Sequence, residues 1–139
     1  MFRCPRITQY ALEAVLDIAW HGHSGPVQSK EITARQGIPR RYLEQVMQEM
    51  VRGGLLVGVR GPRGGYRLAR DPAAISIGDV ARIIDALGPP EVERAGPSQS
   101  PLGLSIVGPL LHETRQNLID RLHGVSIQDL CSRAASAGL

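Results

Sequence analysis

Apolar residues recur at helical spacing in the first part of the chain. Over Thr8–His21 they form a stripe wide enough for a helix that is buried on more than one side, capped by Thr8 and ended by Gly22. A short helix is then predicted over Ser29–Gln36, with Ser29 as its N-cap and Gly37 closing its C-terminal end.

The next helix is predicted from Pro39 to Arg52. Its apolar positions are spaced i, i+3, i+4, i+7, i+8 and are Leu43, Val46, Met47, Met50 and Val51. The opposite face is polar and carries Arg41, Glu44, Gln45, Gln48 and Arg52.

The pattern then changes from helical spacing to alternation. Leu55, Val57 and Val59 are expected on one side of a strand, and a glycine-rich turn over Gly61–Gly65 leads to a second strand that starts at Tyr66. Alternation on both sides of a glycine-rich turn predicts a β-hairpin.

Helical spacing returns in the second half. Ser76–Asp79 has the form of a capping box and predicts a helix with apolar residues through Leu87. A proline-rich loop is expected over Gly88–Pro101, followed by a long helix over about Ser105–Leu122 whose regular part begins near Gly108. A second capping box at Ser126–Asp129 starts a terminal helix.

This order of elements is typical of a winged helix-turn-helix. The expected fold class is therefore mainly α with a small β-hairpin wing, extended by a long C-terminal helix. We expect a DNA-binding domain over residues 1–88, a loop over 89–104, and a long helix with a terminal helix over 105–139.

The positive charge of the chain is concentrated in the predicted helix and wing. The whole chain has a net charge of +3, but seven arginines against two glutamates give residues 39–70 a balance of +5, which leaves −2 for the remainder. Fifteen of the sixteen basic residues are arginine, a residue suited to phosphates and guanine edges, although a GC-rich coding bias would also favour it. A local basic patch is the electrostatic pattern of a nucleic-acid binder.

The candidate DNA-binding residues lie on these two elements. Arginine, glutamine and glutamate side chains can read guanine, adenine and cytosine, whereas wing arginines and glycines suit close approach to phosphates or the minor groove. A solvated helix face and an ordinary tight turn are the structural alternatives. The set is Arg40, Arg41, Glu44, Gln45, Gln48, Arg52, Arg60, Arg63, Gly64, Gly65 and Tyr66.

Other classes of protein find little support. No apolar run is long enough for a membrane span, and the N-terminus lacks the features of a signal peptide. Cys4 and Cys131 form neither a disulfide framework nor a CxxC pair, and no histidine pair has helical zinc spacing. We therefore expect a cytoplasmic protein that is not an enzyme, with no metal or cofactor site.

The motifs ITQYALEAVLDIA, IPRRYLEQ and VRGPRGGYRL resemble the IscR/NsrR/CymR (Rrf-two) family of bacterial winged-helix repressors. The resemblance implies a homodimer joined through the long helix, with each subunit reading half of a palindromic operator. It places base reading at Arg41, Glu44 and Gln45 and sends Arg60 into the minor groove. Because Arg41 stands where the iron–sulfur regulator has a small polar residue, the operator sequence does not carry over.

One departure from the family pattern concerns the cofactor. Members that bind an iron–sulfur cluster carry three cysteines in the loop before the long helix, whereas EVERAGPSQSPLGLS contains none. Carboxylates and hydroxyls are poor substitutes for thiolates, so we expect no cluster of the usual kind. The resemblance then implies a clusterless regulator that takes its signal from a partner protein or from thiol oxidation.

Two alternatives remain open at this stage. One is a redox sensor of the same family that holds a metal or an iron–sulfur cluster through non-cysteine ligands such as Glu13 or His21. The other is a winged helix used for protein contacts instead of DNA.

Overall fold

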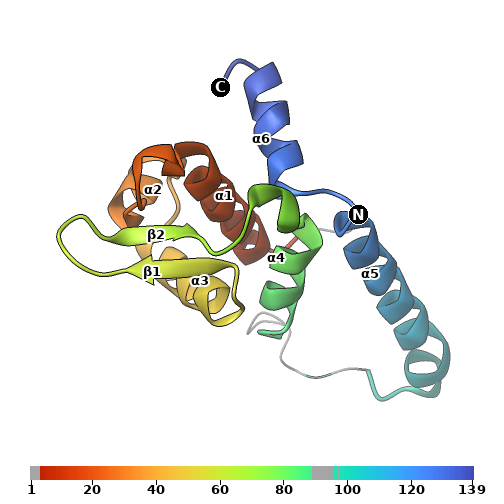
Figure 1. Cartoon of the computed structure of the whole chain (residues 1–139). Helices are drawn as coiled ribbons and strands as arrows, with labels where there is room; N and C mark the ends of the chain where they lie inside the picture. The colour runs from red at the N-terminus through yellow and green to blue at the C-terminus, as the bar shows by residue number, and fades with distance from the viewer. Residues whose placement is uncertain (1–3, 89–95, 97) are drawn as a thin grey trace.

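The computed structural model describes residues 4–88, 96 and 98–139. Within them the chain is mainly helical with one two-stranded antiparallel sheet, which confirms the predicted fold class (Figure 1). The elements are α1 (Arg6–His21), α2 (Ser29–Gln36), α3 (Arg40–Arg52), β1 (Leu56–Val59), β2 (Gly65–Leu68), α4 (Ile77–Asp85), α5 (Gly108–Leu122) and α6 (Ile127–Ser136).

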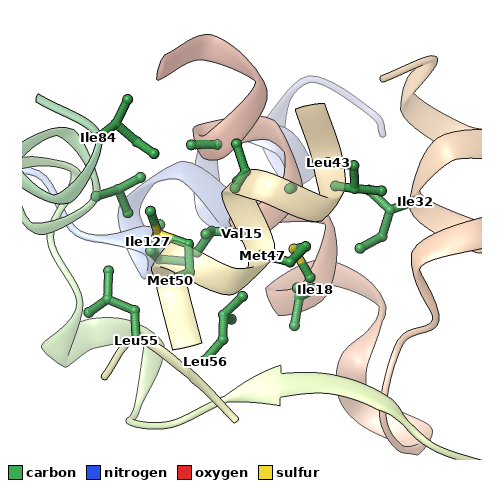
Figure 2. Packing of buried hydrophobic residues seen from close by; sticks show 14 of the residues in the cluster. Val15, Ile18, Ile32, Leu43, Met47, Met50, Leu55, Leu56, Ile84 and Ile127 are labelled. Carbon is green, nitrogen blue, oxygen red and sulfur yellow. The ribbon is translucent and has the colours of Figure 1, made fainter. Parts of the chain in front are cut away.

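The hydrophobic core surrounds α1, which contacts α2, α3, α4 and α6. Val15 and Ile18 of α1 are buried, and Figure 2 shows them in one cluster with Met47 and Met50 of α3. Burying a side chain of this size stabilises a fold by about 1.5–3 kcal/mol. The apolar face predicted for α3 is confirmed except for Val51, which lies at the edge of the stripe and is 39% exposed.

Two helices begin differently from the prediction. α1 starts at Arg6, and the backbone N–H of Thr8 donates to the carbonyl of Pro5 at 3.0 Å, so Thr8 lies inside the helix and is not its cap. At α2 the N-cap is Gln28 and not Ser29, and its N–H donates to Glu31 Oε2 at 2.8 Å. In both cases a residue outside the usual capping types holds the position.

The hairpin pairs β1 with β2 in antiparallel register, with Leu56 opposite Leu68 and Gly58 opposite Tyr66. Leu56 is buried, and Leu68 and Tyr66 on the same side of the sheet pack against the core, so this side faces inward. The predicted alternation was wrong: Leu55 is buried just before the strand, and Val57 and Val59 are half-buried on the side of the sheet opposite Leu56. The bend at Leu55 shifts the alternation by one residue.

Both predicted capping boxes are confirmed. The Ser76 hydroxyl accepts from the Asp79 N–H at 2.9 Å and the Asp79 carboxylate accepts from the Ser76 N–H at 2.9 Å. Ser126 and Asp129 repeat the arrangement at α6. The ring of His123, at the end of α5, places Nδ1 2.9 Å from the Ser76 hydroxyl.

The starts of α4 and α6 are joined by an antiparallel bridge. Ile77 N–H donates to the carbonyl of Val125, and Ile127 N–H donates to the carbonyl of Ile75, both at 2.8 Å. The two helices that follow the capping boxes are therefore tied together at their first turns.

α5 runs along one edge of the molecule, away from the hairpin (Figure 1). It meets α4, where Arg115 lies 3.7 Å from Asp85, and it buries Ile119. Most of its length is nevertheless exposed, and the segment from just before the helix through its middle presents large apolar side chains. These are Leu102, Leu104, Ile106, Val107, Leu110, Leu111 and Leu118.

The start of this long helix combines two helical types. A π-helical turn occupies Gly103–Val107, earlier than the predicted start at Ser105, and the regular α-helix begins at Gly108 as predicted. Most of the loop predicted over Gly88–Pro101 lies outside the described residues. Among the residues that are described, no helix is both long and apolar enough to cross a membrane.

Candidate nucleic-acid interface

The solvent face of α3 brings the predicted polar residues together. The same helical period that buries Leu43, Val46, Met47 and Met50 turns the other side of α3 outward. All six predicted residues of this helix are exposed: Arg40, Arg41, Glu44, Gln45, Gln48 and Arg52.

Charged pairs organise this face. Arg40 Nε donates to Glu44 Oε1 at 3.1 Å, four residues further along, and Arg52 donates to Glu49 Oε1 at 3.1 Å. Glu44 therefore holds an arginine of its own helix. The three arginines of α3 outnumber its two glutamates, so the helix keeps a net charge of +1.

The wing presents its arginines to solvent while its glycines shape the turn. Arg60 and Arg63 are exposed, whereas Gly64 is buried. A Cβ at Gly64 would collide with the backbone of the hairpin, and one at Gly65, with φ +149°, would collide with the carbonyl of Val27. These glycines are therefore required by the internal packing of the wing.

Tyr66 fixes the wing to the body. Its backbone N–H and carbonyl both pair with Val27 at 2.8 Å, and its side chain packs against the core. Tyr66 is half-buried in this position, and its predicted contact with DNA stays a prediction.

Sequence reasoning missed one basic residue near the wing. A cleft separates the tip of the hairpin from the start of α2, and Lys30 and Arg63 both line it. Gln28 spans the cleft, with its side-chain amide donating to the carbonyl of Pro62 at 3.4 Å. The register of the hairpin against Val27 creates this proximity, and no local sequence pattern indicates it.

Sequence reasoning also missed an ion pair that positions α2. Arg35 donates through Nε and Nη2 to the two carboxylate oxygens of Asp17 at 3.0 and 2.8 Å, and Gln36 donates to Asp17 Oδ2 at 2.8 Å. The side chain of Asp17 is fully buried in α1. This Asp17–Arg35 clamp fixes the end of α2, from which the chain turns directly into α3.

The exposed arginines, glutamines and glutamate of α3 lie on the helix that follows the tight turn after α2, and the wing arginines extend the surface from the adjoining hairpin. Guanidinium groups can bind phosphates or guanine, and side-chain amides can bind adenine. The surface as a whole is therefore suited to a duplex.

Comparison with known proteins agrees with this geometry. The sequence model of the Rrf2 family, described as an iron-dependent transcriptional regulator, matches residues 5–133. The chain belongs to the Rrf2 family.

Two relatives of this Rrf2-family chain carry the name HTH-type transcriptional regulator IscR. The protein of Vibrio cholerae is 48% identical over 77 residues, which cover 55% of this chain and 44% of the relative. The protein of Yersinia enterocolitica is 46% identical over 77 residues, covering 55% and 47%. The matched part of the chain thus spans about half the length of these relatives.

Solved structures match over nearly the whole chain. The structure of T. potens IscR has a TM-score of 0.78 at 28% identity and covers 99% of this chain and 92% of its own. The structure of CymR, the global cysteine regulator of B. subtilis, has a TM-score of 0.71 at 27% identity and covers 96% and 98%. The resemblance to this family proposed from the motifs is confirmed.

The iron-dependence named for the family finds no matching thiol set here. Cys4 is exposed before α1, and Cys131 lies on α6, where burial raises the pKa of its thiol. Among the described residues, no three histidine, cysteine, aspartate or glutamate side chains gather closely enough to hold a metal ion. With neither cysteine in the loop before α5, the donors present do not fit a three-cysteine cluster.

Proposed function

We propose that this Rrf2-family regulator is a sequence-specific DNA-binding repressor that acts as a homodimer at a palindromic operator. The observation that carries the proposal is the exposed face of α3, whose base-reading side chain types lie on a helix that adjoins the hairpin with the exposed Arg60 and Arg63. DNA contact is assigned to α3 through Arg40, Arg41, Glu44, Gln45, Gln48 and Arg52, and to the wing through Arg60, Arg63, Gly64, Gly65 and Tyr66.

The dimer is supported by the apolar surface of α5. Leu104, Val107, Leu111 and Leu118 are all exposed and recur at intervals that keep them near one side of a helix. A second copy of the chain, related by a two-fold axis, would cover this side and place two α3 helices on successive half-sites. Such a protein acts where the chromosome is, so we place it in the bacterial cytoplasm.

Regulation in this proposal does not use a three-cysteine cluster. A signal, such as binding of a regulatory partner protein, would change the distance between the two α3 helices of the dimer. Only one of the two distances would fit the half-sites of the operator. The alternative is a sensor that holds a metal or cluster through non-cysteine ligands. One observation favours this alternative: the buried Oε2 of Glu13 has no hydrogen-bond partner among the described residues and so could bind a metal.

Iron analysis separates these two forms. We expect the chain purified without oxygen to be colourless and free of iron. Visible absorbance together with stoichiometric iron that is lost in Glu13→Gln would contradict the clusterless form and favour the sensor.

Binding to genomic DNA tests the main proposal. Purified chain is mixed with fragmented DNA from the organism that encodes it, and the retained fragments are sequenced. We expect a shared palindrome, and anisotropy at physiological salt should show binding to that duplex about 10³-fold or more tighter than to a scrambled one. Equal affinity for both would refute sequence-specific regulation.

A further inference from the structure

The guanidinium of Arg41 is held in place by the next residue of α3. Arg41 Nη2 donates to the Tyr42 hydroxyl at 2.8 Å, and the guanidinium carbon lies 4.7 Å from the centroid of the Tyr42 ring. One side chain therefore supplies both a hydrogen-bond acceptor and an aromatic ring to the same arginine. Arginine interacts favourably with aromatic rings in this way because its cation is planar and weakly hydrated.

Tyr42 is itself held from α1. The ring of Tyr10 lies with its centroid 5.8 Å from that of Tyr42, at an interplanar angle of 36°. This spacing is within the range of favourable aromatic pairs. Tyr10 packs against the hydrophobic core, so the series Tyr10, Tyr42 and Arg41 runs from the core to the exposed end of α3.

The other arginine at this end of α3 is held differently. Arg40 pairs with Glu44, but the two side chains are 86% and 56% exposed, and exposed pairs of this kind impose little order. Arg41 is also exposed, yet it rests on a ring that is anchored to the core. Arg41 is therefore connected to the core through Tyr42 and Tyr10, whereas the pair of Arg40 with Glu44 stays on the exposed face of α3.

We propose that Tyr42 is a specificity-determining residue, which presents the Arg41 guanidinium in one orientation for recognition of a guanine. The inference rests on the proposed DNA-binding function. Reading guanine requires two coplanar N–H groups aimed at O6 and N7, and the hydrogen bond to Tyr42 occupies one of the five N–H groups of arginine. The remaining donors keep a fixed direction as long as Tyr42 holds the group.

The expected size of the effect follows from the ordering of one side chain. A correct guanine contact discriminates against other bases by roughly 5- to 150-fold. Ordering a long side chain on binding weakens affinity by roughly 2- to 10-fold, and this cost is smaller when the side chain is already placed. Loss of the Tyr42 hydroxyl should therefore reduce discrimination at one base pair by about 2- to 10-fold at most.

Selection from a random duplex library tests this. The full chain, Arg41→Ala, Tyr42→Phe and Tyr10→Phe are each used to enrich bound sequences, and anisotropy then measures single-base changes in the preferred site. Arg41→Ala identifies the guanine that Arg41 reads. Tyr10→Phe is the matched control, because it removes a hydroxyl one ring away and keeps both rings. Thermal melting and the salt slope on random DNA establish that each variant is folded and binds phosphates normally.

We expect Tyr42→Phe to lose preference at the same base pair as Arg41→Ala and at no other, with an unchanged salt slope, while Tyr10→Phe selects the original site. The inference is overturned if Tyr42→Phe keeps full preference at that base pair, if Tyr10→Phe loses as much, or if Arg41→Ala changes no position. If the unaltered chain enriches no sequence at all, the proposed function itself fails, which is a distinct outcome.

Discussion

Removing either member of the Asp17–Arg35 clamp should destabilise the fold, but to different degrees. In Arg35→Ala the carboxylate of Asp17 keeps only Gln36, and its side chain is fully buried. Leaving a buried charge in this way costs about 3–5 kcal/mol. In Asp17→Ala the guanidinium of Arg35 is 32% exposed and can turn to water, so we expect a loss of about 2 kcal/mol, the size of a charge-assisted hydrogen bond.

The pH dependence of the free energy of unfolding gives a second signature. Burial alone raises the pKa of Asp17, but the hydrogen bonds from Arg35 and Gln36 and the charge of Arg35 outweigh it and hold the pKa below the ordinary value of 3.8. A carboxyl of this kind stabilises the fold above its unfolded pKa and loses that contribution as the pH falls through its folded pKa. The difference between the unaltered chain and Asp17→Ala should therefore shrink from about pH 5 downward.

Urea denaturation followed by circular dichroism measures both effects, at one fixed protein concentration because dimerisation would also stabilise the fold. Arg40→Ala is the control, since its pair with Glu44 is exposed and should change the free energy of unfolding by less than about 1 kcal/mol. Equal losses for Arg35→Ala and Asp17→Ala, or a difference from Asp17→Ala that is independent of pH, would show that the clamp does not work as described.

Three further changes have distinct expected results. Leu111→Glu should convert a dimer into a monomer by light scattering, and a mass unaffected by the change would remove Leu111 from the interface. Arg63→Ala should weaken binding to operator and random DNA by a similar factor and reduce the salt slope by about 1, whereas Arg60→Ala should reduce the ratio between them. Gly65→Ala, which drives a Cβ into the Val27 carbonyl, should destabilise the fold by about 1–3 kcal/mol in urea denaturation, and an unchanged midpoint would contradict that collision.

Local patterns predicted the elements whose stabilising contacts are local. The capping box of Ser76 and Asp79 lies within four residues, so its hydrogen bonds can be read directly from the sequence. The apolar period of α3 likewise predicted which side is buried and which polar residues share the solvent face. These are the features on which the candidate DNA-binding surface depends.

Contacts between distant segments could not be predicted in this way. Asp17 and Arg35 are 18 residues apart, and each is an ordinary charged residue of its own helix until packing brings them together. Lys30 and the wing line the same cleft because Val27 pairs with Tyr66. The Tyr10–Tyr42 contact is of the same kind, since it depends on how α1 crosses α3.

The hydrogen bonds where α4 and α6 begin hold one end of α5, so a small change of angle there displaces the other end by a larger distance. Two hydrogen bonds attach the C-terminal end of α5 to the start of α4: Ile77 N–H to the carbonyl of Val125, and the Ser76 hydroxyl to the His123 ring. The fifteen residues of α5 extend about 22 Å from this attachment. A tilt of about 10° at this attachment moves the N-terminal end of α5, at Gly108, by about 4 Å. A shift of a few ångströms at that end therefore corresponds to a rotation of several degrees at the first turn of α4, a helix that also contacts α3.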